Sequence, residues 1–152
     1  MKQLLYIFIL LFGFVSAFSS FIAQGSIPNE VTGVWLSENK KQKIIVSYDS
    51  ISKTYIGRII WMHEDEQSAG RTMLDTKNPN KILQTRRLTG ITLIYDLKPT
   101  SKDRFSGTIY DPNTGKDYKC NLKLRPDKKS VEIRAYFVSP IFGRTEIATK
   151  VD

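Results

Sequence analysis

One polar stretch of the chain places an acid, an amide and two arginines where they can recognise an anion. Asp75 and Asn78 lie in a segment that ends at the adjacent pair Arg86 and Arg87. Successive residues entering a β-strand project to opposite faces, so one arginine should point toward the interior or rim of a sheet, where an unpaired guanidinium is costly. We favour an ion pair with Asp75 or Asp111 that holds the segment in place. The alternative is bidentate binding of a ligand carboxylate or phosphate.

Catalytic chemistry has few residues available in this chain. His63 is its single histidine, which excludes a metal site of several histidines and makes any Ser-His-Asp mechanism depend on that residue. It precedes the acidic run 64–66, and no G-x-S-x-G motif accompanies it. A glycosidase-like pair would require Asp75 and Asp111 to approach each other. We therefore expect a protein that is not an enzyme, without metal or cofactor, and keep a hydrolase using loop carboxylates as an alternative.

Segment 111–117 combines carboxylates and amides in a way that resembles a calcium-binding loop. Its glycine comes one position early, and Leu122 occupies the position of the bidentate glutamate. A hairpin turn explains the same residues better: Pro112 sets φ, Asp111 caps the turn, and Gly115 adopts a left-handed conformation. We predict a turn here and no metal site.

The elements that must position these residues are predicted to be strands. Beyond residue 25 the chain has three alanines against 32 isoleucines, valines and threonines, which favours sheet over helix. Apolar and polar residues alternate along 116–125 and 131–137, the period of a half-buried strand. Short turns separate most strand candidates, which are Thr32–Ser37, Lys43–Tyr48, Thr54–Met62, Leu88–Leu97, Arg104–Tyr110, Asp117–Leu124, Ser130–Val138 and Arg144–Val151.

This succession predicts an all-β fold, a single antiparallel meander closed into a barrel of about eight strands. The interior of such a barrel is filled by side chains or holds one small ligand. The connection 63–87 is unusually long, and long loops in compact domains are often functional. A short helix is expected within it at Asn80–Gln84.

Seven ordered segments resemble the bacterial family called domain of unknown function 2147. They are Gly33-Val34-Trp35 and residues 55–61 (YIGRIIW), 75–79 (DTKNP), 86–90 (RRLTG), 106–112 (SGTIYDP), 115–118 (GKDY) and 142–145 (FGRT). The resemblance implies an exported protein of lipocalin-like topology whose activity is uncharacterised. One departure is Ala135, where the family usually has glycine, so a tight backbone approach is not expected there.

The G-x-W of residues 33–35 also resembles the first-strand signature of lipocalins. That resemblance implies that Trp35 closes one end of the barrel beneath a basic side chain from the last strand. Arg144 is the expected partner, through a cation–π contact. In this interpretation both residues have a structural role.

The N-terminal residues predict export. Lys2 precedes an apolar run that starts at Leu4, and small residues follow, which is the pattern of a secretory signal peptide. We predict a signal in 1–25 and one β-barrel domain in 26–152, in the periplasm or secreted. Because the apolar run reaches Ala23, an uncleaved membrane anchor is the alternative.

Charge and cysteine content limit the partners. The net charge is +8, yet basic residues such as Lys119 and Lys123 are spread over solvent-facing strand positions, so we expect no nucleic-acid partner. Weak association with an anionic envelope surface is compatible with this charge. Cys120 is the single cysteine and shares the apolar register of Leu122, which predicts a buried thiol.

The leading hypothesis is a barrel that binds a small amphipathic or lipid-like molecule. One alternative is an envelope interaction module with a solid barrel, for which the sequence does not identify a protein partner. The other alternative is the hydrolase described above. The ligand-binding candidates combine aromatic residues able to line a barrel cavity with polar residues of the long loop and the rim: Trp61, Asp75, Lys77, Asn78, Arg86, Arg87, Tyr110, Asp111 and Arg134.

Overall fold

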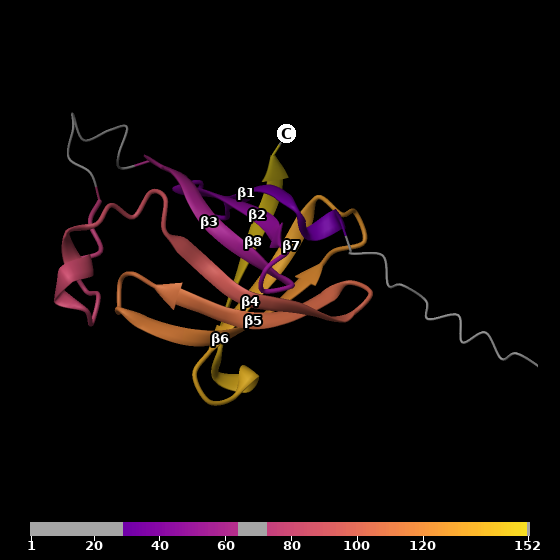
Figure 1. Ribbon diagram of the computed structural model, residues 1–152. Helices are drawn as coiled ribbons and strands as arrows, with labels where there is room; N and C mark the ends of the chain where they lie inside the picture. Colours follow the sequence, from indigo (N-terminus) through magenta and orange to yellow (C-terminus); the bar gives the residue numbers. More distant parts are fainter. Residues whose placement is uncertain (1–28, 64–72, 152) are drawn as a thin grey trace, which may run out of the picture.

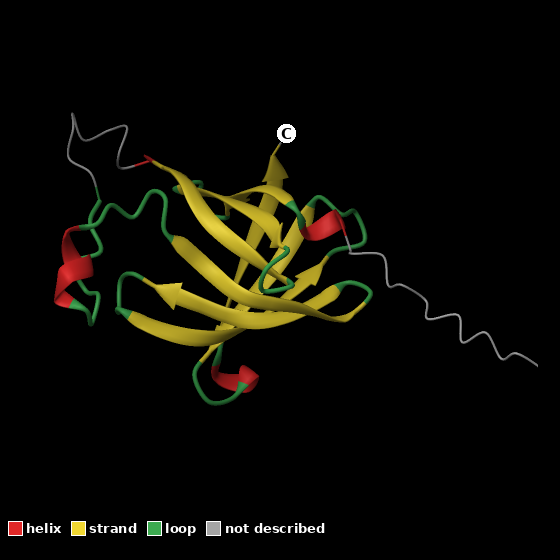
Figure 2. Cartoon of the chain, in the orientation of Figure 1, coloured by secondary structure: helices red, strands yellow, loops and turns green. Residues whose placement is uncertain are grey.

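Eight antiparallel strands form a closed barrel in a computed structural model that describes residues 29–63 and 73–151 (Figures 1 and 2). Each strand pairs with the next, and the last pairs with the first. The predicted signal and residues 64–72 of the long connection lie outside the described ranges. The strands are β1 (Gly33–Ser37), β2 (Gln42–Asp49), β3 (Thr54–Met62), β4 (Thr92–Ser101), β5 (Arg104–Asp111), β6 (Lys116–Leu124), β7 (Ser130–Tyr136) and β8 (Arg144–Val151). Within the described ranges, three short 3-10 helices accompany them: η1 (Asn29–Val31), η2 (Lys81–Thr85) and η3 (Pro140–Phe142).

The predicted all-β barrel is confirmed, and most strands begin and end within one or two residues of the prediction. The main difference is β4, which begins at Thr92 instead of Leu88. The backbone N–H of Leu88 donates to Met73 at 2.8 Å, so this residue pairs with its own loop instead of with the barrel. The short helix expected in the long connection is also present as η2, with the Asn80 side chain accepting from the N–H of Ile82.

Alternate side chains of the strands fill the barrel. The largest fully buried residues include Tyr55, Phe105 and Ile59, and the rings of Tyr55 and Phe105 meet edge to face at 5.7 Å. Burial of such a side chain contributes about 1.5–3 kcal/mol to stability. Cys120 is buried among them, and burial raises the pKa of its thiol to about 12, so this thiol is inert at neutral pH.

The meander sorts the connections between two ends of the barrel. One end, which we call the plugged end, carries η1, the turns β2–β3, β4–β5 and β6–β7, and the end of β8. The other, which we call the loop end, carries the connections β1–β2, β3–β4, β5–β6 and β7–β8. The described part of the β3–β4 connection, residues 73–91 with η2, projects from the loop end (Figure 1).

Lys150, not Arg144, covers the plugging tryptophan. Trp35 is 3% exposed, and its indole N–H donates to the carbonyl of Val31 at 2.9 Å. Lys150 lies opposite Trp35 in the β1–β8 register, with its Nζ 5.3 Å from the ring centroid. The expected pairing with Arg144 is wrong because that residue begins β8 at the loop end, where its exposed guanidinium contacts Glu146 at 3.0 Å.

Replacing Lys150 with methionine should lower the free energy of unfolding by about 1–2 kcal/mol. Methionine keeps the apolar stem but removes the cation–π contact and the hydrogen bond from Nζ to the carbonyl of Glu30, which spans 3.0 Å. Urea unfolding measures the change. Arg144→Met is the matched control, expected to change stability by less than about 0.5 kcal/mol because Arg144 is exposed. Equal losses in the two variants would contradict the assignment of Lys150.

Candidate functional site

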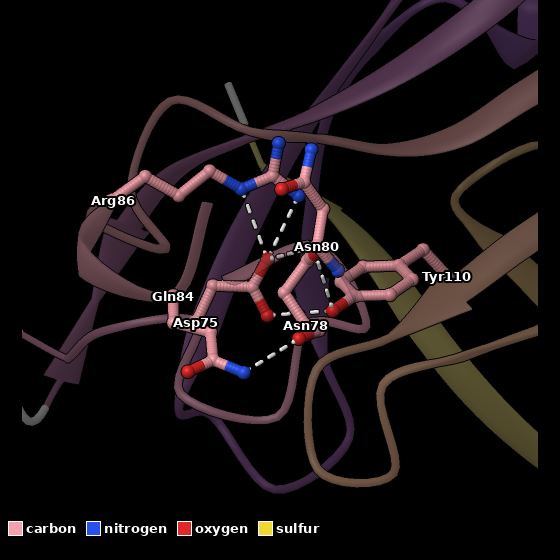
Figure 3. A network of polar contacts seen from close by, with 6 residues as sticks. All are labelled: Asp75, Asn78, Asn80, Gln84, Arg86 and Tyr110. Atoms are coloured by element: carbon pink, nitrogen blue, oxygen red, sulfur yellow. Dashed lines mark hydrogen bonds and ion pairs between the residues drawn. The ribbon is translucent and has the colours of Figure 1, made fainter. Parts of the chain in front are cut away.

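Three of the four side chains that the sequence marked for anion recognition, Asp75, Asn78 and Arg86, meet Tyr110 in one polar cluster on the outside of the barrel (Figure 3). The Asp75 carboxylate is fully buried at its centre. Its Oδ1 accepts from the Tyr110 hydroxyl at 2.6 Å. Its Oδ2 accepts from Asn78 Nδ2 at 2.8 Å and from both Nε and Nη2 of Arg86, at 2.9 and 2.8 Å.

Backbone contacts close the connection around this carboxylate. The N–H of Asp75 donates to the carbonyl of Arg86 at 3.0 Å, and Leu74 and Arg87 form an isolated antiparallel bridge. Between these ends, the Gln84 side chain donates to the carbonyl of Asn78 at 2.9 Å (Figure 3). The segment is thus a closed loop that Tyr110 of β5 attaches to the barrel wall.

Electrostatics favours an ionised Asp75. Burial raises the pKa of its carboxyl, but hydrogen bonds from Tyr110, Asn78 and Arg86 outweigh burial and hold that pKa below its ordinary value. Burial, together with the neighbouring carboxylate, raises the pKa of Tyr110 to about 12. The Arg86 guanidinium also lies 5.9 Å from the Tyr110 ring centroid. At neutral pH the cluster therefore holds one carboxylate, one guanidinium and a neutral phenol.

This polar cluster holds the loop against the barrel, and its carboxylate is not free to react. Of the two interpretations of the arginine pair, the structure has the ion pair: Arg86 binds Asp75, while Arg87 is exposed. Both carboxylate oxygens are engaged and shielded from water, so neither is available as a base or as a ligand contact. Lys77 is exposed, and the Arg86 guanidinium is bound to Asp75 through Nε and Nη2, which does not favour the anion-binding alternative at Arg86.

The other carboxylate and the histidine lie apart from this cluster. Asp111 stays in the predicted β5–β6 turn, where its side chain accepts from the N–H of Asn113 at 2.9 Å and from the Thr114 hydroxyl at 3.1 Å. Asp75 and Asp111 thus have separate partners, which does not favour the paired-carboxylate hydrolase. His63 is exposed beside the ring of Trp61. Within residues 29–63 and 73–151, no group of three or more histidine, cysteine or acidic side chains is placed to hold a metal ion.

Trp61 and Arg134 do not line the barrel interior. The β2–β3 register shifts between Lys43 and Ile44, so Trp61 pairs with Lys43, whose Nζ lies 5.1 Å from the indole centroid. A one-residue shift exchanges the faces of a strand, which places Trp61 on the outer surface. Arg134 anchors the β7–β8 connection by donating to the carbonyls of Pro140 and Ile141 and to the hydroxyl of Thr145.

A small cavity of about 50 Å³ lies inside the barrel. Its walls are mainly aliphatic, and Ser37, Gln42 and Glu146 provide polar groups among its lining. None of these three was a candidate from the sequence. The alternating pattern of β8 could have identified Glu146, because residues two apart on a strand face the same side and Ala148 faces inward. The aliphatic lining is Val31, Trp35, Ile44, Val46, Leu93, Ile94, Ile109, Leu122, Val131, Ile133, Ile147 and Ala148.

Residues 33–150 match the family described as "Uncharacterized protein conserved in bacteria (DUF2147)". The chain belongs to this family. The resemblance drawn from the seven segments is thereby confirmed, and the four residues of the polar cluster of this DUF2147 protein come from three of these segments. No curated protein sequence matches the chain at a significant level.

Among solved structures, this DUF2147 barrel is similar to protein HP1028 from Helicobacter pylori, described as belonging to the lipocalin family. The TM-score is 0.67 at 17% sequence identity, over 80% of this chain and 82% of that chain. At this identity the likeness shows the fold alone. The lipocalin-like topology is therefore confirmed. No helix among the described residues of this DUF2147 protein is long and apolar enough to cross a bilayer.

The ionised state of Asp75 predicts a pH dependence of stability. Because the folded state lowers this pKa below 3.8, the carboxylate stabilises the fold above pH 3.8, and the contribution is lost as pH falls through the folded-state pKa. The stability difference between the wild type and Asp75→Asn should thus be largest near neutral pH and shrink below about pH 4. Urea unfolding of both proteins across this range measures it. A difference independent of pH would contradict the assignment.

Proposed function

We propose that this protein is an exported, non-enzymatic barrel that binds the apolar end of a small amphipathic molecule. The cavity inside the barrel carries this proposal, because its aliphatic wall also includes Ser37, Gln42 and Glu146. A concave apolar site with a few polar groups is the usual form of a small-molecule site. Export rests on the signal-like segment at residues 1–25.

The size of the cavity limits the ligand. Ligand pockets usually enclose about 300–1,000 Å³, whereas this cavity has about 50 Å³. The barrel as it stands accepts only a few carbon atoms. A longer chain requires displacement of lining side chains, and Ile109 and Ile133 are the ones to move because both are only partly buried against the core.

The polar lining indicates which head group fits. Glu146 is partly exposed and its carboxylate contacts Arg144, so it has oxygen available to accept a hydrogen bond. Ser37 donates its hydroxyl to Asn39 at 2.8 Å. As the structure describes it, this lining offers oxygen acceptors and the Gln42 amide, and it includes no cation. It therefore suits a hydroxyl or amine head group better than a carboxylate or phosphate.

Native mass spectrometry tests this proposal. The protein is purified from its host envelope and measured before and after extraction with organic solvent. We expect a discrete extra mass that extraction removes. Ala148→Val should lower its occupancy at least tenfold, because Ala148 is 5% exposed and lines the cavity. Thr149→Val is the matched control, since Thr149 is the next residue on β8, faces outward, and should leave occupancy unchanged.

A solid-barrel interaction module is the second candidate, and the small cavity volume favours it. A bare mass in the wild type, with no change on extraction, would contradict ligand carriage and support this candidate. An extra mass that Ala148→Val and Thr149→Val retain equally would place the ligand outside the barrel.

A further inference from the structure

The connection between β7 and β8 exposes four large apolar side chains within six residues. Phe137, Val138, Ile141 and Phe142 are 71, 82, 80 and 89% exposed. Single exposed apolar residues are common on protein surfaces, but a contiguous group marks an interaction site. We call this group the apolar tip. The connection that carries it projects from the barrel beyond β6 at the bottom of Figure 1, and η3 forms the turn of this connection.

The connection is held in a defined conformation, so its exposed side chains are presented to a partner. The Ser139 side chain caps η3 by accepting from the N–H of Ile141, and the N–H of Gly143 donates to the carbonyl of Pro140. Arg134 donates to the carbonyls of Pro140 and Ile141 from the barrel wall. This preorganisation reduces the ordering cost when the apolar tip binds.

A basic hollow adjoins the connection that carries the apolar tip, and the two meet at Pro140. Arg104, Lys123 and Arg134 line the same surface hollow as Pro140, a hollow of about 490 Å³. The groups that Arg134 contacts are carbonyl and hydroxyl oxygens, which leave its charge uncompensated. Among the described residues that line the hollow, Glu132 is the one acidic residue, and it is paired with Arg125 at 3.1 Å. The hollow therefore attracts an anion.

We propose that the apolar tip docks on a lipid bilayer that contains anionic lipids. The four apolar side chains enter the boundary between head groups and acyl chains, and the basic residues of the hollow contact lipid phosphates. Apolar and cationic groups side by side match this surface. A second copy of the chain is a poorer match because it carries the same net charge of +8. This inference goes beyond the proposed ligand and does not depend on it.

Vesicle co-sedimentation tests the proposal with the protein isolated from its host. We expect binding to vesicles of phosphatidylethanolamine and phosphatidylglycerol that weakens with added salt, and at least tenfold weaker binding to phosphatidylcholine vesicles. The double variant I141S/F142S should lose at least tenfold in affinity, with an unchanged circular dichroism spectrum because both side chains are exposed. Ile51→Ser is the matched control, since Ile51 is 93% exposed at the plugged end, and its affinity should change less than twofold.

A second measurement gives a signal that appears on binding. In Phe142→Trp, tryptophan emission should shift to shorter wavelength with anionic vesicles, and brominated acyl chains should quench it. Absence of wild-type binding, or equal binding by I141S/F142S and the wild type, would overturn the proposal. A dimer in analytical ultracentrifugation that I141S/F142S abolishes would overturn it in favour of a second copy as the occupant.

Discussion

Asp75→Asn is expected to lower the free energy of unfolding by about 2–4 kcal/mol, one of the two largest effects we predict for a single substitution. The change removes the charge that faces the Arg86 guanidinium and weakens the acceptor for Tyr110 and Asn78. Breaking a fully buried ion pair by removing one partner usually costs more, about 3–5 kcal/mol. We expect less here because Arg86 is 36% exposed and water can solvate it.

Urea unfolding at neutral pH measures this loss, with Asp96→Asn as the control. Asp96 is exposed and has a φ of +53°, a conformation that asparagine also tolerates, so its replacement should change stability by less than about 0.5 kcal/mol. A double-mutant cycle with Tyr110→Phe should give a coupling energy of about 1 kcal/mol or more. Additive effects would contradict the direct bond between Tyr110 and Asp75.

Gly115→Ala is expected to destabilise the protein by about 2–4 kcal/mol. Gly115 ends the β5–β6 turn with a φ of +67°, where any other residue is strained. A Cβ at this position would overlap the carbonyl oxygen of Lys77 and lie 2.8 Å from its carbonyl carbon. The substitution therefore forces the loop that holds Asp75 and Asn78 away from the barrel wall.

Gly90→Ala is the control that separates the cost of a positive φ from the cost of the overlap with the Lys77 carbonyl. Gly90 has a φ of +102°, yet a Cβ there would have no atom within 4 Å. Its replacement should cost only the backbone strain, about 1 kcal/mol. Thermal and urea unfolding of both variants measure the difference. Equal losses would show that Gly115 matters for its φ alone and that the loop does not rest on the turn.

The polar cluster shows where sequence reasoning reached its limit. The chemistry of the residues predicted that an arginine would pair with an acid, and Arg86 does bind Asp75. Which arginine turns toward the acid was open, because residues 73–74 pair with 87–88 as a small separate ladder and not as part of β4. The partner hydroxyl of Tyr110 comes from 35 positions away, and no local pattern brings those residues together.

The sequence by itself determined the all-β class, the succession of strands, the β5–β6 turn and the family, because strand alternation and turn chemistry are local properties of the chain. The tertiary structure alone decided which side chains share a surface. A register shift at Lys43 turns Trp61 outward, and the β1–β8 pairing puts Lys150 over Trp35 where Arg144 was expected. The physical reason is that side-chain direction has a period of two, so one bulge or one residue of register exchanges inside and outside. Only the closed barrel fixes that register.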